Sequence, residues 1–363
     1  MKLVITSDWE LTTARLPVAR EILMDLCMRV DEGSRLVFCG DMFREFNAAT
    51  VEFACGALSL MGHKPMLLIG NHDREVGADR LSAVFHRDMH TFDVPRVFHP
   101  VGLPVLAFLP APDRAAFGVA RGAEGKRARD AALSQALESA LISLETQIGP
   151  ENLGRAVLFA HAATDGEELG LGQLASGLTW TIPGARLQRW GRVFLGHVHK
   201  PGQIAENVWS VGGIANWTFA DKAEQFRALT LDTETFEVGE IPLKRVLVPI
   251  EMELTDPSSN HPSYVTMWAM SMMEERGIKL ATDTVSLKIR ARLPQNEMAL
   301  VPSADELRDA INALVERPLI QNCIITREVT GLHKARLTSE QSAREMTLEQ
   351  MLELYIETTK ATD

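Results

Sequence analysis

The stretch LLIGNHD, from Leu67 to Asp73, decides the fold class because an apolar run ends abruptly in three polar residues. Such an uninterrupted run is typical of a strand that is buried on both faces, in a sheet that helices cover. Gly70 predicts the turn that leaves the strand, and an amide, an imidazole and a carboxylate follow it. The stretch therefore predicts a buried strand with chemically active side chains at its carboxyl end.

Four further apolar runs end in the same way, each at a residue type that binds metals or protons. They are KLVITSD, ending on Asp8; RLVFCGD, ending on Asp41; AVLFAH, ending on His161; and RVFLGHVH, which contains His197 and His199. In α/β sheets, ligands bind beyond the carboxyl ends of the strands. We therefore expect the polar side chains of all five runs to converge.

Segments with helical spacing separate these strands. One runs from Ile22 to Val30 and is expected to stop at Gly33, and a second covers Thr50–Gly62. A third covers most of Pro112–Ile148, with an expected loop at RGAEGKRAR. Strands and helices that alternate in this way predict an α/β layered domain.

The chain beyond Lys200 has a different pattern. NVWSVGG, RALTLD and FEVGEIPL predict short strands without intervening helices. Further on, VSLKIRARL alternates apolar and polar residues, Ser303 and Glu306 have capping-box spacing before an amphipathic helix, and NCIITREV predicts another strand. We predict a first domain at residues 1–245, a small α+β domain at 246–335, and a C-terminal linker and helix at 336–363.

Composition and charge restrict the class of protein. No apolar run approaches the ~20 residues needed to cross a bilayer, and an acidic residue comes too early at the N-terminus for a signal peptide. The four cysteines, Cys27, Cys39, Cys55 and Cys323, lack CxxC spacing, which predicts buried, reduced thiols in a cytoplasmic protein. The net charge of −11 argues against unassisted binding to nucleic acid.

The strand-end residues combine carboxylate, imidazole and amide donors without a thiolate, which suits Mn²⁺, Fe²⁺ or Zn²⁺. A single Asp or His after a strand is usually a cap, but five such sites in one chain argue for a shared centre. The donors exceed the needs of one ion, and two ions ~3.5–4 Å apart, bridged by one carboxylate, would use them all. The residues are Asp8, Glu10, Asp41, Asn71, His72, Asp73, His161, His197 and His199.

The motifs SDWEL, CGDMF, IGNHD, AHA and LGHVHKP, in this order, resemble those of the calcineurin-like metallophosphoesterases. GNHD and the small second domain make the chain most similar to the SbcD-type DNA-repair nucleases within that superfamily. The resemblance implies a layered α/β core of mixed β-sheets covered by helices, followed by an α+β capping domain at 246–335. It also implies hydrolysis of phosphodiester bonds with two divalent metal ions, for which Mn²⁺ is our first expectation and Mg²⁺, Fe²⁺ and Zn²⁺ are alternatives.

The resemblance also implies a role for each strand-end residue. Asp41 would bridge the two ions, with Asp8, Glu10 and His199 completing the first site and Asn71, His161 and His197 the second. His72 would protonate the leaving oxygen or stabilise the charge on the phosphate, and Asp73 would orient His72.

Position 10 departs from the family pattern, which has histidine there. Glu10 is a natural ligand that favours harder ions, the mark of a weakened site in a regulated or inactive subunit, or an engineered substitution. The sequence leaves these three interpretations open.

The resemblance implies a DNA endo- and exonuclease that acts in repair or recombination. Its partners would be DNA and an SMC-like coiled-coil ATPase, in a heterotetramer with a homodimer of this chain and no membrane. Thr50–Gly62 is a candidate dimer helix. Two rival functions remain: a phosphodiesterase acting on nucleotides or small phosphoesters, and a catalytically weakened scaffold that binds DNA ends.

Three further features of the sequence give weaker indications of function. MTLEQMLELYIETT predicts an amphipathic helix that starts at Leu348 and docks on the ATPase. Lys288, Arg290 and Arg292 form a basic row, either solvated or in contact with DNA. His86 and His90 have metal-binding spacing but no third ligand nearby, which indicates solvated side chains.

Overall fold

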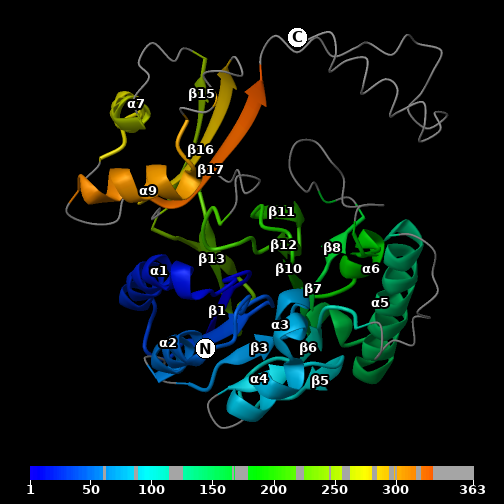
Figure 1. Ribbon diagram of the computed structural model, residues 1–363. Helices are drawn as coiled ribbons and strands as arrows, with labels where there is room; N and C mark the ends of the chain where they lie inside the picture. The colour runs from blue at the N-terminus through cyan, green and yellow to red at the C-terminus, as the bar shows by residue number, and fades with distance from the viewer. Residues whose placement is uncertain are drawn as a thin grey trace, which may run out of the picture. The chain divides into compact units, whose positions relative to one another are not determined.

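The computed structural model describes residues 1–59, 63–85, 89–113, 126–165, 167, 179–217, 225–244, 247–255, 262–279, 284–293, 298, 301–315 and 320–329 (Figure 1). The chain divides into two compact units. The first comprises Met1–Pro249 with Lys279–Ser286, and the second comprises Ile250–Ile278 with Leu287–Asp363. The continuous part of the first unit thus ends at Pro249, where the sequence predicts a boundary after residue 245.

The first sheet of the first unit has six strands, in the order β14-β13-β1-β2-β3-β4. Four of them run parallel to their neighbours: β1 (Lys2–Thr6), β2 (Arg35–Phe38), β3 (Met66–Leu68) and β4 (His90–Phe92). β13 (Arg227–Asp232) and β14 (Val238–Pro242) extend the sheet in antiparallel fashion. The runs that end near Asp8, Asp41 and Asn71 therefore lie side by side and point the same way.

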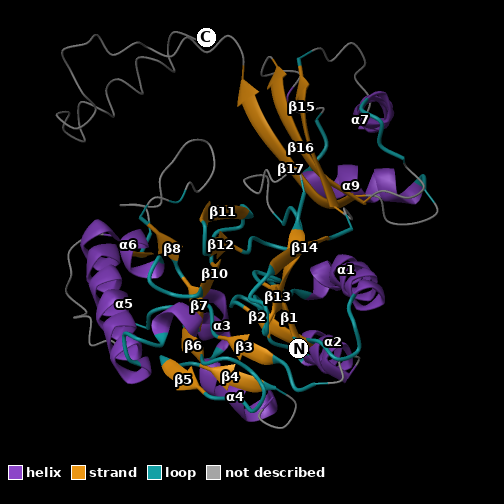
Figure 2. Cartoon of the chain, turned by 180° about the vertical axis from the view of Figure 1, so that it is seen from behind, coloured by secondary structure: helices purple, strands orange, loops and turns teal. Residues whose placement is uncertain are grey.

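The second sheet also has six strands, in the order β11-β12-β10-β7-β6-β5. Its parallel centre consists of β12 (Val208–Ser210), β10 (Arg192–Gly196), β7 (Val157–His161) and β6 (Leu106–Leu109). The edge strands β11 (Gly202–Ala205) and β5 (Arg96–Phe98) are antiparallel (Figure 2). β7 and β10 end at His161 and Gly196, so these ends also lie side by side.

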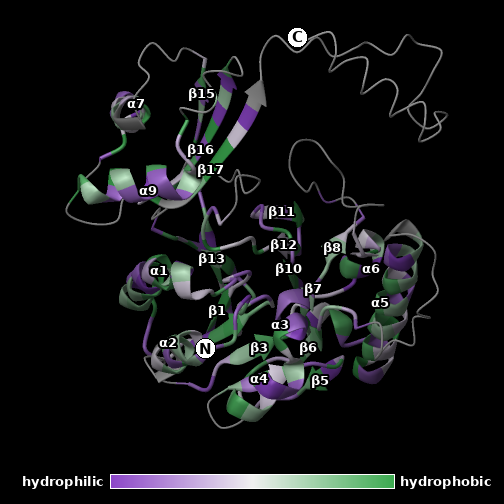
Figure 3. Cartoon of the chain, in the orientation of Figure 1, coloured by the Kyte–Doolittle hydropathy of each residue, from purple (hydrophilic) through white to green (hydrophobic). Residues whose placement is uncertain are grey.

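The two sheets pack face to face through one apolar cluster. Leu3, Ile5 and Val37 of the first sheet belong to it together with Phe108, Phe159 and Phe194 of the second. A row of stacked rings crosses the second sheet from Phe108 through Phe159 and Phe194 to Trp209, with centroids 5.2–5.6 Å apart. Each such pair adds roughly 0.5–1.5 kcal/mol beyond area burial, and Figure 3 colours much of these strands as hydrophobic.

Helices cover the outer face of each sheet, as the unbroken apolar runs predict. α1 (Leu16–Arg29), α2 (Ala48–Ser59) and α4 (Ala78–Phe85) pack on the first sheet, where Val4 and Leu36 face them. α5 (Lys126–Ile148) and α6 (Gly184–Leu187) pack on the second. The predicted α/β layered class is confirmed, in the form of two mixed sheets between helical layers.

Helix boundaries differ from the sequence predictions at two places. α1 ends with Val30 as its C-cap, before the predicted stop at Gly33. α5 begins at Lys126, inside the stretch RGAEGKRAR where we predicted a loop. Residues 126–129 of this stretch are helical because Lys, Arg and Ala are strong helix formers.

Short elements complete the first unit. α3 (Asn71–Val76) follows β3, and β8 (Ala163–Thr164) pairs with β9 (Thr181–Ile182). Two 3₁₀ turns, η1 (Thr13–Arg15) and η2 (Leu153–Arg155), lie before α1 and β7. No helix in the described ranges is long and apolar enough to span a membrane.

The three-stranded sheet beyond β14 has the order β15-β16-β17, formed by β15 (Leu247–Leu254), β16 (Thr284–Leu293) and β17 (Ile320–Val329). Its helices are α7 (Pro262–Glu275) and α9 (Ala304–Ala313). The predicted capping box is confirmed, since Ser303 and Glu306 each accept from the backbone of the other. The predicted alternation in β16 is confirmed except at Ser286, which is buried.

Basic side chains of the row on β16 form ion pairs with acidic side chains of β15. Lys288 lies 3.6 Å from Glu251, and Arg292 lies 2.6 Å from Glu253, both on β15. Lys288 and Arg292 thus have acidic partners, and DNA contact through the row stays a prediction. Of the predicted metal-spaced pair, His90 packs against Phe98, while His86 lies outside the described residues. The predicted C-terminal helix from Leu348 also lies outside them.

The cysteines agree with the sequence prediction only in part. The four cysteines, all of them in described ranges, form no disulfide. Cys39 is buried, but Cys55 is exposed, so the prediction of uniform burial was wrong. Cys55 lies in α2, on the helix face that points away from the first sheet, which its apolar sequence neighbours do not reveal.

Candidate metal centre

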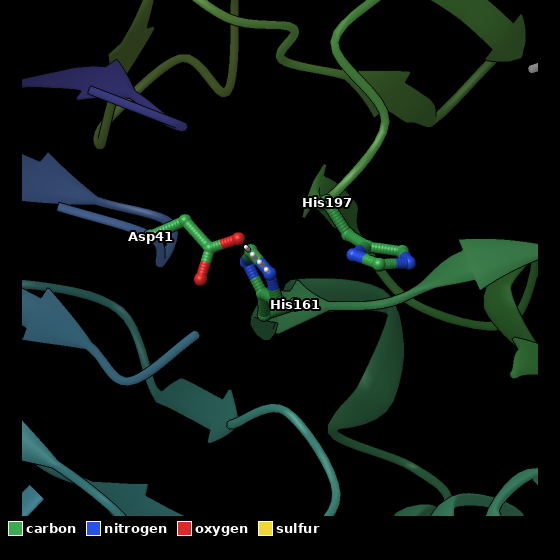
Figure 4. Close-up of side chains that lie close together, drawn as sticks. All are labelled: Asp41, His161 and His197. Atoms are coloured by element: carbon green, nitrogen blue, oxygen red, sulfur yellow. Dashed lines mark ion pairs between the residues drawn. The ribbon is translucent and has the colours of Figure 1, made fainter. Parts of the chain in front are cut away.

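The carboxyl ends of β2, β3, β7 and β10 bring four side chains together, here called the Asp41 cluster: Asp41, Asn71, His161 and His197. Nε2 of His161 lies 3.3 Å from Asp41 Oδ2 and 3.2 Å from Asn71 Oδ1. Nδ1 of His197 lies 3.1 Å from the same Asn71 oxygen. Figure 4 shows Asp41 directed at His161, with the His197 ring alongside. Donor atoms of Asp41, His161 and His197 all lie within 4.8 Å of one another, as a shared cation requires.

A glycine precedes each of three site residues because a side chain there would collide with the centre. A Cβ on Gly70 would lie 2.1 Å from Asp41 Oδ1, and one on Gly40 would lie 2.1 Å from His161 Nδ1. A Cβ on Gly196 would lie 2.0 Å from the Cys39 carbonyl oxygen. The glycines of GD, GN and GH therefore allow the strand ends to approach closely.

Backbone strain is also concentrated at this place. Asp8, Glu10, Asp41 and His197 have positive φ angles of 52°, 44°, 52° and 90°. A left-handed conformation costs a non-glycine residue roughly 1–2 kcal/mol, and such strain gathers at functional sites when the surrounding structure enforces it. Here the sharp turns aim each side chain inward from its strand end.

Hydrogen bonds fix which nitrogen of each imidazole faces the centre. Nδ1 of His161 donates to the Cys39 carbonyl at 2.7 Å, which leaves Nε2 toward Asp41. Nε2 of His197 bonds to the Thr179 hydroxyl at 2.9 Å, which leaves Nδ1 toward Asn71. Trp180 stacks on the His197 ring at 4.7 Å. Partners of this kind orient metal-binding histidines and raise their basicity.

Charges inside the cluster are strongly coupled. Burial opposes ionisation of Asp41, yet the adjacent His161 holds the pKa of Asp41 well below its usual range. Burial would favour neutral His161, but the Asp41 carboxylate raises the pKa of His161 to about 9. Burial and the charge of His161 lower the pKa of His197 to about 3. His197 is thus neutral, whereas His161 is protonated near neutral pH and would have to lose its proton before Nε2 could bind a metal.

Asp8 adds an unsatisfied anionic oxygen at the edge of the cluster. Its Oδ2 accepts from the Ser7 hydroxyl at 2.5 Å and from the His197 backbone at 3.2 Å. Its Oδ1 is buried without a hydrogen-bond partner in the described part of the chain and lies 3.6 Å from Nε2 of His199. A buried, orphaned carboxylate oxygen is stabilised by a cation. The donors and this oxygen therefore fit a divalent metal ion.

Glu10 does not have the surroundings that we predicted for a metal ligand. Its buried carboxylate accepts from Arg15 Nη1 on Oε2 at 2.6 Å and from Arg44 Nη2 on Oε1 at 3.0 Å. Nε2 of His199 is more distant from Oε1, at 3.7 Å. Arg15 follows Glu10 by five residues, whereas Arg44 meets the carboxylate because the turn after β1 and the turn after β2 lie side by side, which no spacing in the sequence reveals.

His72 lies at the edge of the cluster, and the carboxylate beside it is not the predicted one. Its backbone N–H donates to Asp41 Oδ1 at 2.8 Å, and its Nδ1 bonds to Glu75 at 3.1 Å. Asp73 instead points back and accepts from the backbone N–H groups of Phe43 and Gly70. The assignment of Asp73 as the partner of His72 was wrong, because both of its oxygens hold two loops together. Burial and the nearby Asp41 raise the pKa of Asp73 to about 7.

Several residues of the site do not belong to the strand-end pattern. Arg44 stands three positions after Asp41 in GDMFRE, and Glu75 stands one helical turn after His72, so both carried a local signal. Arg15 and Thr179 carried none, because only the folded chain brings them to the site. The structure places all of the predicted residues at neighbouring strand ends, and Glu10, His72 and Asp73 are those for which the partners described above were not predicted.

Comparisons with known proteins identify only remote structural similarity. No protein-family model and no curated protein matches the chain. An archaeal phosphodiesterase is 15% identical with a TM-score of 0.33, over 67% of this chain and 100% of that one. A 5′-nucleotidase precursor of Thermus thermophilus is 14% identical with a TM-score of 0.37, over 68% and 54%. The NAD nucleotidase of Haemophilus influenzae is 10% identical with a TM-score of 0.35, over 67% and 49%.

This chain thus spans about half the length of both nucleotidases. All three names describe hydrolases of phosphate compounds. Similarity of this degree assigns neither a substrate nor a partner to the chain, and function has to follow from the site itself.

Proposed function

We propose that this protein is a metal-dependent phosphodiester hydrolase of the calcineurin-like type. One observation carries the proposal: five strand ends, far apart in sequence, converge on a set of carboxylate, amide and imidazole donors, of which Asp8, Asp41 and His161 are buried. The backbone is strained at Asp8, Asp41 and His197, which belong to this set. Mixed oxygen and nitrogen donors without a thiolate suit the divalent ions that hydrolyse phosphoesters.

The Asp41 cluster would hold the ion. Bound there, a divalent ion would attract phosphate oxygens, stabilise the charge that develops on them, and make a coordinated water more acidic. His161 and His197 are already oriented for this by the Cys39 carbonyl and by Thr179. The protein thus contributes a preorganised, largely buried centre.

The two ring nitrogens of His72 have different partners, Arg44 at Nε2 and Glu75 at Nδ1. A guanidinium only donates hydrogen bonds, so Nε2 of His72 accepts the 2.9 Å contact from Arg44. The ring proton then lies on Nδ1, which donates to Glu75. Nε2 thus has a lone pair in this state, and His72 would protonate a leaving oxygen only after its ring has gained a second proton. Its side chain is 21% exposed, so Nε2 is accessible to a substrate.

Hydrolysis of bis-p-nitrophenyl phosphate tests the proposal. The metal-free protein should be inactive, and Mn²⁺, Mg²⁺ or Zn²⁺ should restore turnover of this diester above that of p-nitrophenyl phosphate, a monoester. Absence of turnover with every one of these ions, in protein shown to bind metal, would contradict the proposal.

The finer proposal is that the diester is DNA and that the partner is an SMC-like coiled-coil ATPase. The order of the five motifs and the α+β elements that follow them support it. Linear DNA should then be degraded, faster when the ATPase is added, and at a rate above that for nucleotide diesters. Preference for small diesters would favour the rival phosphodiesterase, and metal-independent DNA binding without cleavage would favour the scaffold.

A further inference from the structure

Glu10 is the centre of an ion cluster, here called the Glu10 cluster, that also contains Arg15 and Arg44. Arg15 Nη1 donates both to the Glu10 side chain at 2.6 Å and to the Glu10 backbone carbonyl at 3.0 Å. Arg44 Nη2 donates to the other carboxylate oxygen at 3.0 Å. Only 1% of the Glu10 side chain is exposed, so solvent does not compete for it.

The two arginines differ in what they offer to a ligand. Arg15 is 14% exposed and lies over the Trp217 ring, 4.9 Å from its centroid. Arg44 is 42% exposed, so part of its guanidinium faces solvent. One carboxylate cannot neutralise two guanidiniums, which leaves positive charge on the outer member of the cluster, Arg44.

Arg44 also lies where a substrate phosphate would arrive. Its Nη2 is 2.9 Å from Nε2 of His72, and the His72 backbone N–H is bonded to Asp41. A phosphate that reaches from the Asp41 cluster to His72 therefore passes the guanidinium. Arginine is suited to this contact because its planar fork of donors matches two phosphate oxygens.

The same contacts disfavour Glu10 as a metal ligand. Its charge is already compensated by two guanidiniums, and a cation bound at Oε1 would meet Arg44 at close range. In contrast to the Asp41 cluster, the described carboxylates and imidazoles around Glu10 do not form a set with all donor atoms within 4.8 Å. The predicted first ion therefore lacks one of its expected ligands.

We propose that Arg44 is the phosphate-binding residue of this site, and that Glu10 is a positioning residue that holds Arg44 instead of a metal ligand. The proposal rests on the proposed phosphodiester hydrolysis, because it assigns the group that grips the phosphate. It requires no second tightly bound metal ion.

Metal content tests the role of Glu10. Glu10→Gln keeps the size of the side chain and removes its charge, and the variant should bind as many equivalents of Mn²⁺ as the wild type in calorimetric titration. Loss of one equivalent would overturn the proposal, because it would make Glu10 a ligand. His161→Ala is the positive control, and it should lose the tightly bound ion.

Kinetics with bis-p-nitrophenyl phosphate test the role of Arg44. Arg44→Gln should raise KM by roughly 10- to 100-fold and lower kcat much less, while Arg44→Lys should restore part of the affinity. Glu10→Gln should raise KM in the same direction, by about tenfold. Arg20→Gln, at an exposed arginine of α1, is the matched control and should change neither constant.

Inorganic phosphate separates failure of this inference from failure of the proposed function. If the metal-loaded wild type hydrolyses no diester, the proposed function fails, and phosphate binding by calorimetry still tests Arg44. Phosphate bound more weakly by Arg44→Gln than by Arg20→Gln supports the inference. Equal binding by both variants, or an unchanged KM in an active enzyme, overturns it.

Discussion

The Asp41 cluster and the Glu10 cluster each contain a buried carboxylate, but different groups surround it in each. In the Asp41 cluster the carboxylate faces two imidazoles and an amide, and no arginine is within hydrogen-bonding distance of it among the described residues. In the Glu10 cluster the carboxylate is met by two guanidiniums that belong to the chain itself. The imidazole beside Asp41 can lose its proton and leave the carboxylate to a metal, whereas the guanidiniums beside Glu10 keep their charge, so Glu10 positions an arginine.

The largest expected effect comes from removing the carboxylate of the Asp41 cluster. Asp41→Ala should abolish tight metal binding and lower diester turnover by at least about 1,000-fold, or about 4 kcal/mol of barrier. His199→Ala, on the Glu10 side, should keep the tightly bound ion. Metal analysis of the purified variants checks both, with His99→Ala at an exposed histidine as the control. If Asp41→Ala still retains its ion, the two clusters do not differ as described.

Glycine substitutions test whether the Asp41 cluster depends on the close approach of the strand ends. Gly70→Ala places a methyl group against Asp41 and should lower the free energy of unfolding by about 1–3 kcal/mol and weaken metal binding. Gly33→Ala has open space around the added carbon and should change the free energy of unfolding by less than about 0.5 kcal/mol. Chemical denaturation of both variants measures the difference. Equal stability would mean that the strand ends can move apart without loss.

The pH dependence of metal affinity should also distinguish the Asp41 cluster from the Glu10 cluster, with a smaller effect. The pKa of His161 is raised to about 9 in the metal-free protein, and a ligand has to be deprotonated before it binds. Metal affinity should therefore rise with pH, by about tenfold per unit for one released proton, and level off above about 9. Mn²⁺ titrations at several pH values below about 9 measure this slope. Glu10→Gln should leave the slope unchanged. A flat profile would contradict the protonated state of His161.

The smallest expected effect separates the two carboxylates near His72. Glu75→Gln should lower kcat by about tenfold or less, because an outer partner orients the ring, and should leave the free energy of unfolding unchanged. Asp73→Asn should instead lower the free energy of unfolding by about 1–3 kcal/mol, since an amide group cannot accept both backbone N–H groups on two oxygens. The reverse result would restore the original assignment of Asp73.

Much of the fold was predictable because burial leaves a periodic record in the sequence. The unbroken run LLIG predicts a strand with both faces buried, and Leu67 and Leu68 do face opposite sides, one toward the helices and one toward the second sheet. That the strands form two stacked sheets was not readable from any single run. The pairing depends on contacts such as Phe92 against Phe108, whose rings stack at 3.6 Å across the two sheets.

The sequence by itself determined which residue types stand at the strand ends, and hence that the chain presents carboxylate, amide and imidazole groups at one edge. It did so because strand, turn and polar residue follow one another within a few positions. Only the tertiary structure decided the distant partners of Glu10 and Asp73, because these partners come from other turns. Arg44 reaches Glu10 across 34 positions, and Phe43 reaches Asp73 across 30. The local sequence determines which donor groups stand at the strand ends. The charged groups that surround each donor depend on which loops the sheets bring together.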